Sequence, residues 1–490
     1  MVLILQGYVG RPRPGKPKRG RGERGGSVLS SLSALPPALR QGVAHLFLDI
    51  AIDSLFNTCI KSFTERAKGE QARGGRILSW ALVVGLFPLA CGGQEALRVS
   101  LAGAEAARAR HAAASSLSYD NLKLGPTAWS FGAGLGIEAN DNIRLESVDA
   151  RADLIFHPRL DAHMLCRLSQ INSLTLDVGV GYSAYVWHPE FSRFFVIPGS
   201  ALSLDLYIGD FWINFHDRFS ITENAYQDPT VVGSADFSQL INTLGLQATL
   251  DLNKLILKLG YDHVSYLWLH STAGTANSQP NGESDVFFSS AGFTFGSGLV
   301  AGVDLGGSLF HYSDVSPGQP YSDATEWNAG TFVDAQLTEH MHGRLSGGYT
   351  VYTPESTDMS AQFSEYRGLY GRLELEHRVN QYLTSRLSGG HSVNFAFYGG
   401  TVNMYSARWQ GDWNLLRDIA VCTSFEYEHG SQLLSGGETF DRYGPAISVG
   451  RAITEKLDAR VAYQFYWRES DLPGRNYTVN IGTVNLAYKF

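Results

Sequence analysis

The chain has 490 residues, of which 44% are hydrophobic and 18% charged, and it is rich in Gly, Phe and Tyr. Residues 1–92 hold 13 of the 39 basic residues but only 5 of the 47 acidic ones, so residues 93–490 carry a net charge of about −16. That charge argues against a nucleic-acid partner. The cysteines have neither CxxC nor metal-ligand spacing, so we predict no disulfide framework, no metal and no cofactor. They are Cys59, Cys91, Cys166 and Cys422.

The first 93 residues have the composition of a segment that the mature protein lacks. Residues 11–24 carry seven basic residues among Pro and Gly, which is also typical of an arm that binds nucleic acid or anionic lipid. Residues 76–93 have the layout of a signal peptide, because a basic residue precedes an apolar run that ends in small residues. The run is too short for a spanning helix. We therefore interpret residues 1–75 as a non-native or disordered extension and residues 94–124 as an Ala-rich leader.

Residues 125–490 alternate between apolar and polar side chains, with no sustained helical period, and we predict an all-β, antiparallel transmembrane β-barrel. Strand side chains alternate with period two, so each segment has one apolar and one polar face. An even strand number is what bacterial single-chain barrels prefer. We expect eighteen strands, at 127–139, 150–161, 172–186, 199–209, 212–223, 242–252, 255–269, 284–297, 299–313, 324–338, 341–354, 364–379, 382–397, 401–417, 419–430, 439–453, 456–469 and 476–490.

The links between these strands alternate in length. Tight turns are expected at 209–211, 251–254, 338–340, 379–382 and 454–456, and longer polar links at 224–241, 270–283, 314–323 and 355–363. The short 398–400 link on the long-loop side is an exception. Short periplasmic turns and longer extracellular loops are typical of an outer-membrane barrel.

The last strand favours a membrane barrel over a soluble sandwich. Val484, Leu486, Tyr488 and Phe490 share one face, and polar residues occupy the other. Strands of a soluble sandwich usually have about five or six residues, whereas segments of about fifteen can cross a membrane obliquely. An internal repeat adds to this pattern, because residues 338–349 recur as 380–391 and are echoed at 454–461. Each copy is a turn followed by a strand with an Arg on its polar face.

From these features the chain resembles the β-barrel porin families of bacterial outer membranes. The resemblance covers about residues 125–490 and depends on the terminal Leu486, Tyr488 and Phe490, on the opening strand at 136–142 and on the strand at 172–182. It implies an outer-membrane location and an assembly signal in those three terminal side chains, read by the barrel-insertion machinery. Some members are associated with exopolysaccharide export. No catalytic residue follows from it.

An outward apolar face places many charged residues in the lumen. One hypothesis is a basic ring, with Arg344, Arg386 and Arg460 at similar height and acidic groups across the pore. The alternative is that these charges pair with neighbours on adjacent strands. Eighteen strands can enclose an aqueous channel. The predicted pore-lining residues are Lys258, Asp262, Asp304, Glu326, Asp334, Arg344, Arg372, Glu374, Glu376, Arg386, Arg408, Asp412, Glu426, Glu428, Asp458, Arg460 and Arg468.

Aromatic residues divide in the same way. We expect an interface girdle or wall from Trp129, Tyr182, Trp268, Trp327, Trp409, Trp413, Trp467 and Tyr488. The polar phase holds the candidates for a saccharide track, Tyr207, Trp212, Tyr370 and Tyr466.

The sequence contains no motif for catalysis. His216-Asp217 and Asp262-His263 are adjacent pairs on strands, and adjacent side chains point to opposite faces. Gly-x-Ser-x-Gly and HExxH are both absent. We therefore predict a non-enzymatic, porin-like channel for passive or weakly selective diffusion of small hydrophilic solutes or saccharides. The alternatives are a barrel associated with exopolysaccharide export, a structural barrel or, as a rival class, an outer-membrane enzyme. A homo-oligomer is compatible with the sequence.

Overall fold

The computed structural model describes residues 122–490, apart from residues 223, 235–237, 270–280, 297, 314–321, 356–364, 396–400, 417–418 and 434–435. The predicted extension, the signal peptide and the leader as far as residue 121 lie outside the described residues. The last residues of the predicted leader form a short strand, Leu122–Leu124.

In the part of the chain that the structure describes, twenty strands form a single sheet in which every neighbouring pair is antiparallel. Two short 3₁₀ turns, η1 at Pro189–Phe191 and η2 at Ala225–Gln227, lie in the connections. No described helix is long and apolar enough to cross a membrane. The strands are β1 (Leu122–Leu124), β2 (Thr127–Asn140), β3 (Asp153–Arg167), β4 (Ser173–Tyr185), β5 (Arg193–Val196), β6 (Ala201–Ile208), β7 (Phe211–Thr222), β8 (Gln239–Asp251), β9 (Leu255–Trp268), β10 (Asn281–Phe295), β11 (Leu299–Ser313), β12 (Ala324–Thr338), β13 (Met341–Pro354), β14 (Tyr366–Arg378), β15 (Leu383–Phe395), β16 (Thr401–Leu416), β17 (Ile419–Gln432), β18 (Thr439–Ala452), β19 (Leu457–Ser470) and β20 (Tyr477–Lys489).

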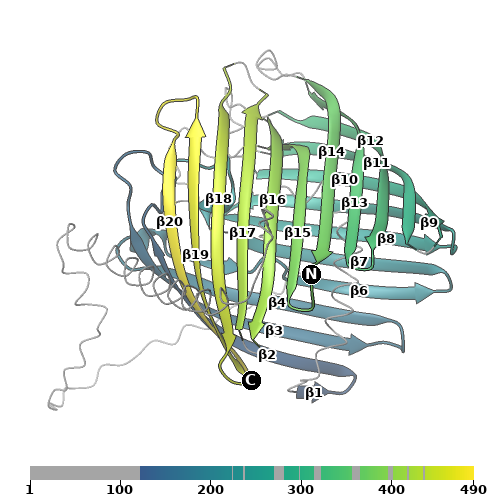
Figure 1. Cartoon of the computed structure of the whole chain (residues 1–490), viewed down its shortest axis with the longest axis horizontal. Helices are drawn as coiled ribbons and strands as arrows, with labels where there is room; N and C mark the ends of the chain where they lie inside the picture. Colours follow the sequence, from purple (N-terminus) through teal and green to yellow (C-terminus); the bar gives the residue numbers. More distant parts are fainter. Residues whose placement is uncertain are drawn as a thin grey trace, which may run out of the picture.

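The sheet closes into a barrel because the last strand pairs with the first long one. β20 pairs with β2 from Gly132↔Lys489 to Asn140↔Ile481, and the Phe490 amide donates to the Phe131 carbonyl at 3.1 Å. β1 extends the wall beside β2, beyond the end of β20. β5 and β6 share one place in the wall, between β4 and β7, so the described strands make eighteen positions. The predicted antiparallel barrel is confirmed (Figure 1).

Most strand ends lie within three residues of the prediction, and three strands have the predicted bounds: β11, β12 and β13. The predicted strand 150–161 is wrong at its end, since β3 continues to Arg167. Asp161 and His163 suggest a strand end by their polarity, but they lie on the inner face, where the His163 ring contacts Asp177 of β4 at 2.5 Å. The sequence prediction also missed β1 and β5.

Every strand has one apolar face, and the large exposed side chains of the strands lie on that face. On β12 these are Trp327, Val333 and Leu337, whereas Glu326 and Asp334 alternate with them on the other face. Glycines leave room for aromatic rings on the inner face: a Cβ at Gly260 would fall on the Phe288 ring. This glycine–aromatic packing fixes the register of neighbouring strands.

Candidate functional site

All seventeen charged residues predicted to line the pore lie on the inner face of the wall. Direct cross-strand partners share a face, and the pairing runs unbroken from one such residue to the next: Arg344 opposes Asp334 and Glu374, and Arg408 opposes Glu426. Contacts through the interior identify this face as the inner one. A side chain of β18 bonds to the segment after β7, although many strands separate the two along the wall.

Several of these charges pair with neighbours on adjacent strands, which agrees with the alternative to a basic ring. Arg344 lies 3.6 Å from Asp334, and Arg408 lies 3.4 Å from Glu426. Arg386 bridges two strands, because it contacts Glu376 at 3.4 Å and Asp412 at 2.7 Å. These pairs satisfy the wall along β12–β17.

The other predicted pore-lining side chains have the same inward position with different neighbours. Arg372 contacts Glu374 at 3.0 Å, and Asp458 contacts Lys489 at 3.3 Å. Lys258 lies between Thr249 and Ser290 in the cross-strand rows. Arg460 lies opposite Gly450 and Asn485 and is exposed to the interior.

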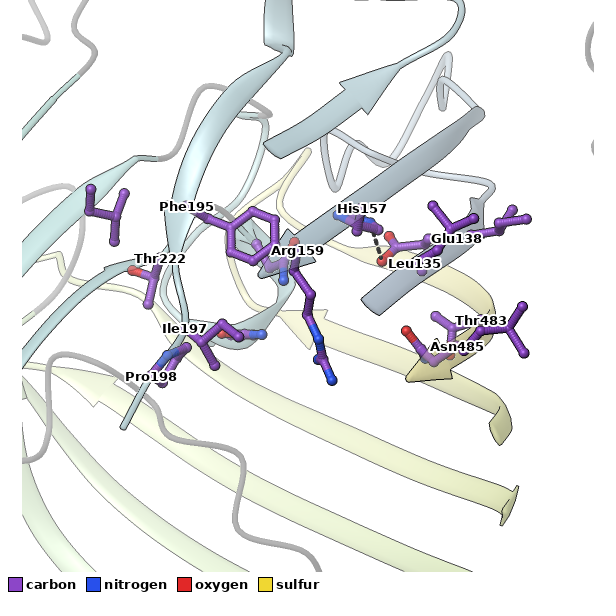
Figure 2. Close-up of a pocket in the computed structure, with 16 residues that line it drawn as sticks. Leu135, Glu138, His157, Arg159, Phe195, Ile197, Pro198, Thr222, Thr483 and Asn485 are labelled. Carbon is purple, nitrogen blue, oxygen red and sulfur yellow. Dashed lines mark ion pairs between the residues drawn. The ribbon is translucent and has the colours of Figure 1, made fainter. Parts of the chain in front are cut away.

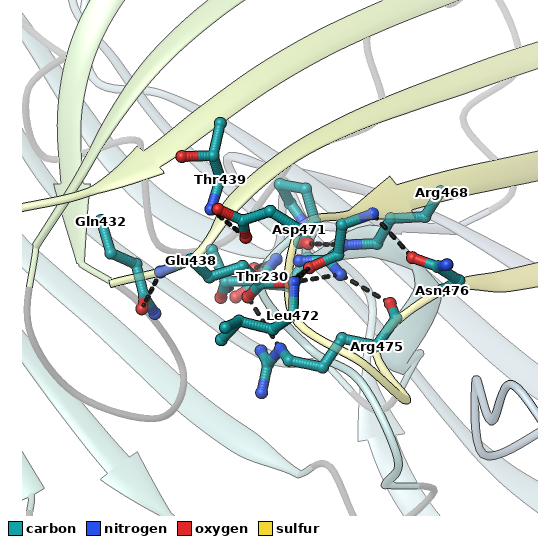
Figure 3. Close-up of polar contacts among 12 residues, drawn as sticks. Thr230, Gln432, Glu438, Thr439, Arg468, Asp471, Leu472, Arg475 and Asn476 are labelled. Carbon is teal, nitrogen blue, oxygen red and sulfur yellow. Dashed lines mark hydrogen bonds and ion pairs between the residues drawn. The ribbon is translucent and has the colours of Figure 1, made fainter. Parts of the chain in front are cut away.

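Two buried ion-pair clusters lie on the inner face towards the long-loop ends of β17–β19. Arg442 contacts Glu428 at 2.5 Å, and both side chains are under 5% exposed. Glu438 lies between Arg468 and Arg475, each at 2.8 Å (Figure 3). Burial acts to raise the pKa of Glu438, but the bonds from Arg468, Ser470 and Arg475 outweigh it and lower that pKa below the usual value.

The segment after β7 folds into the barrel against these clusters. Arg442 Nη1 donates to the Tyr226 carbonyl at 2.7 Å, and Arg468 Nε donates to the Pro229 carbonyl at 3.2 Å. Each arginine therefore joins the wall to the same inward segment, residues 224–234, which we call the inner loop. Burial is the largest effect on the Asp228 carboxyl in this loop, and it raises the pKa although hydrogen bonds from Thr230 and the charges of Arg442 and Arg468 act to lower it.

Apolar contacts complete the docking of the inner loop. Val231 and Val232 pack on Tyr466, Val479 and Ile481 of β19 and β20, in one buried cluster. The β2–β3 connection joins them, because Leu145 belongs to the cluster and its carbonyl accepts from the Gly233 amide at 3.2 Å. Two inward connections thus narrow the long-loop mouth. Sequence reasoning missed them, although the Val231-Val232 pair in an expected polar loop was an available signal.

A cavity of about 210 Å³ lies on the inner wall between β2, β3, β5, β7 and β20. Figure 2 shows its acidic and basic groups together, with the His157 ring 3.5 Å from Glu138. His157 Nδ1 also contacts Ser183 Oγ at 2.7 Å. Arg159 and Asn485 are further polar lining groups, and the Phe195 ring forms an apolar wall. The cavity can hold a small polar solute with one apolar face.

A buried His–Asp pair lies elsewhere on the inner face, and it is not a catalytic triad. His216 Nε2 lies 3.0 Å from Asp262, across Gly245. The histidine of the His216-Asp217 pair thus contacts the aspartate of the Asp262-His263 pair. Ser203 opposes His216 in the register. However, His216 Nδ1 contacts Asn214 Oδ1 at 2.9 Å, and Ser203 accepts from Asn214 Nδ2 at 2.8 Å. The serine therefore has no base directed at it.

The aromatic candidates divide between the two faces mainly as expected. Tyr207 and Trp212 stack on the inner face at 6.2 Å, and Tyr370 reaches across Gly348 and Gly330 to donate to Asp304 at 2.8 Å. The prediction is wrong for Trp268, which lies on the inner phase and packs against the inner-loop cluster. The others of the expected girdle, Trp129, Tyr182, Trp327, Trp409, Trp413, Trp467 and Tyr488, lie on the outer phase.

No protein-family model and no curated protein matches the chain. The solved structures with a similar arrangement of strands include the following three outer-membrane proteins. OccK7 (OpdD) of Pseudomonas aeruginosa has a TM-score of 0.43 and 10% identity over 75% of this chain and 99% of that one. OccAB2 of Acinetobacter baumannii has a TM-score of 0.42 and 11% identity, over 74% of this chain and 98% of that one. The outer membrane protein OpdK of P. aeruginosa has a TM-score of 0.41 and 13% identity, over 74% of this chain and 98% of that one. At these scores the barrel is established by the strand pairing of the chain itself.

Proposed function

We propose that the chain is a channel of the bacterial outer membrane, through which small hydrophilic solutes or saccharides diffuse. The observation that carries the proposal is the contrast between the two faces of the closed β-sheet, one apolar and one charged. Between its two rims the outer face bears apolar side chains, such as Leu257, Leu259 and Leu305, and the inner face bears paired charges. A closed barrel is one of two structures that satisfy every backbone group inside a bilayer.

Two acidic residues of the outer phase lie near the long-loop ends of their strands, which supports the membrane location. Asp285 is four residues from the start of β10 and contacts His263 at 2.9 Å. Asp441 is the third residue of β18 and contacts His429 at 3.0 Å. Tyr443 and Trp467 lie next to this row, with ring centroids 5.3 Å apart, as an interfacial girdle would.

The inner face supports a polar pathway with a narrow mouth. Ion pairs between neighbours keep the wall hydrated without a strong field of one sign, which favours weak selectivity. The inner loop restricts the size of the solute, and the cavity beside Glu138 and Arg159 offers a place for it along the wall. We further propose that the barrel-insertion machinery recognises Leu486, Tyr488 and Phe490.

Planar-bilayer conductance of the refolded barrel, starting near residue 93, tests the proposal. We expect steady single-channel conductance that added oligosaccharides reduce. A variant with Trp212→Ala should change the sugar block, because Trp212 stacks on Tyr207 at the inner face, and Trp327→Ala on the outer face is the matched control. A folded, heat-modifiable barrel without conductance would contradict the channel.

A further inference from the structure

The cavity beside Glu138 lies at the long-loop end of the lumen. Glu138 is two residues before the end of β2, and Thr222 is the last residue of β7. Asn224, at the start of the inner loop, lines the cavity as well. Because the inner loop also narrows the long-loop mouth, a solute that enters there meets this cavity at the start of its path.

The floor of the cavity is bare backbone at Gly136 of β2. Gly136 opposes His157 of β3 on one side and Asn485 of β20 on the other. A Cβ at Gly136 would lie 2.8 Å from Asn485 Oδ1 and 3.2 Å from the His157 Cβ, so both neighbours lean over the glycine. Glu138 lies two residues further along β2 and Arg159 two residues further along β3, on the same inner face. Polar side chains of three adjacent strands therefore converge on one recess.

Glu138 is a buried carboxylate with spare capacity to accept hydrogen bonds. Its side chain is about 5% exposed, and among the described residues it accepts from Asn140 Nδ2 at 3.1 Å. His157 Nε2 lies 3.5 Å away, which is longer than an ordinary N–H···O bond. A carboxylate offers about four lone-pair sites, and burial makes unused ones costly. Glu138 can therefore accept from a donor that enters the cavity.

Two side-chain amides and a guanidinium add donors to the recess. Among the residues that the structure describes, the Asn485 amide makes no hydrogen bond, and the Asn224 side chain makes no capping bond to η2. Arg159 contacts Asp161 through Nε at 3.4 Å, which leaves its terminal nitrogens for other partners. An amide both donates and accepts, whereas a guanidinium only donates. With Glu138, these groups form a mixed hydrogen-bonding surface.

The apolar side of the cavity is formed by Phe195. A Cβ at Gly181 of β4 would fall on the Phe195 ring, so the ring lies across the bare backbone of that glycine on the inner face. Figure 2 shows Phe195 on one side of Arg159, with Glu138 and Asn485 on the other. The cavity thus has one aromatic face and one polar face.

We propose that this cavity is a subsite for one neutral hexopyranose ring, which packs its C–H face on Phe195 and presents vicinal hydroxyls to Glu138 and Asn485. A hydroxyl donates to a carboxylate and accepts from an amide or a guanidinium, so it matches every polar group of the recess. The cavity volume of about 210 Å³ is below the range of about 300–1,000 Å³ that is usual for drug-sized ligands, so it holds a single ring.

The two charges of the recess disfavour charged sugars. In this orientation an anionic sugar places its carboxylate near Glu138, and a cationic sugar places its ammonium near Arg159. Like charges at a binding site lower affinity. The subsite rests on the channel proposed above for its role in solute passage, and it deepens that function by naming neutral sugars as the solutes that the entrance binds.

Saturation-transfer NMR on the refolded barrel tests the subsite, in a detergent without a sugar headgroup. The probe is methyl β-D-glucopyranoside, compared with glucuronate, glucosamine and L-leucine, which is a zwitterion with an apolar side chain. We expect saturable binding of the glucoside, about tenfold tighter than binding of either charged sugar. Absence of glucoside binding, or tighter binding of any of the other three, would overturn the proposal.

Two variants assign the binding to this cavity. Asn485→Ala removes an amide that the wall does not use, so the variant should fold like wild type and bind the glucoside about fivefold more weakly. Asn328→Ala is the matched control, because Asn328 lies over Gly306 of the inner face in the same way, far from the cavity. Equal binding by these two variants contradicts the assignment.

Glu138→Gln adds a readout that a structural role would not change. It keeps the shape of the side chain but removes its charge, so glucoside binding should weaken while glucuronate binding strengthens. Loss of binding for both sugars in equal proportion would contradict direct contact between Glu138 and the solute. If this variant does not fold, Asn485→Ala and its control carry the test.

Conductance of the same preparations separates the subsite from the channel, because binding in detergent does not require passage. Conductance without glucoside binding overturns the subsite and leaves the channel intact. Glucoside binding that Asn485→Ala weakens, in a barrel that does not conduct, supports the subsite and contradicts the channel.

Discussion

Arg442 joins the barrel wall to the inner loop, and its substitution should release that loop. Arg442→Met removes the bond to the Tyr226 carbonyl and leaves the buried Glu428 without its cation. Breaking a buried ion pair on one side costs about 3–5 kcal/mol. We expect a lower free energy of unfolding, measured by denaturant titration of the refolded barrel.

Glu428→Gln is the matched control for Arg442→Met, since the double variant no longer buries a lone charge. The double variant should recover part of the stability that Arg442→Met loses, without restoring the bond to Tyr226. An unchanged unfolding midpoint in Arg442→Met alone would show that the loop does not depend on this contact.

Asp228 gives the inner loop a pH dependence. Because its pKa is raised when the loop is docked, the docked state favours the neutral carboxyl. Docking is therefore most stable below the ordinary pKa of about 4 and weakens as pH rises through the raised value. Asp228→Asn should dock independently of pH and be cleaved less by protease at neutral pH.

Protease cleavage of the inner loop between about pH 4 and pH 8 measures this difference. Titration of Glu438 does not explain a loss of docking as pH rises. Its pKa is lowered, so its stabilising contribution is lost only as pH falls into a more acid range. The same pH profile in wild type and Asp228→Asn would exclude Asp228 as the cause.

At the scale of strands, glycine–aromatic packing makes a sharp prediction about β17 and β18. A Cβ at Gly430 would fall on the buried Phe440 ring, so Gly430→Ala should destabilise the barrel by about 1–3 kcal/mol. Gly450→Ala is the control, because the nearest atom to its Cβ would be on the flexible Arg460 side chain at 3.4 Å, and the next two are backbone oxygens at 3.9 Å. Denaturant midpoints of the two variants should differ clearly, and equal midpoints would refute the packing argument.

The last strand supports a second prediction, about assembly. Deleting Phe490 removes its amide bond to Phe131 and the edge-on contact of its ring with Tyr488 at 5.4 Å. We expect less heat-modifiable barrel in the outer-membrane fraction. Lys489→Gln, on the inner face, should assemble normally. Equal amounts of the deletion variant and wild type would count against an assembly signal.

Strand positions could be predicted from the sequence because each strand carries its own evidence. Alternation in residues 324–338 separates Trp327 and Val333 from Glu326 and Asp334 without reference to any other part of the chain. β5 could not be found in this way, because it has four residues and only Phe194 and Val196 mark its outer face. The direct opposition of Arg408 and Glu426 needed the register, which depends on turn geometry as well as on pattern.

At the scale of the whole molecule, the contents of the lumen were beyond sequence reasoning. The inner loop is held by side chains of β18 and β19, more than 200 residues away in the chain. Two of those bonds end on backbone carbonyls, which leave no trace in residue type. The short pairing of β14 with β15, which among the described residues runs only from Arg378↔Thr384 to Arg372↔Gly390, was hidden for a similar reason, since both strands alternate normally.

Removal of the inner loop should widen the channel, because this loop and the β2–β3 connection narrow the long-loop mouth. Replacing residues 225–233 by a Gly-Ser linker removes the buried Val231 and Val232 and both carbonyls that accept from arginines. We expect single-channel conductance in planar bilayers to rise at least twofold. Val231→Ser with Val232→Ser keeps the length of the loop and should raise conductance in the same direction, because two hydroxyls replace the apolar contacts of docking. If both variants conduct like wild type, the narrowest part of the pathway lies deeper, among the paired charges of the wall.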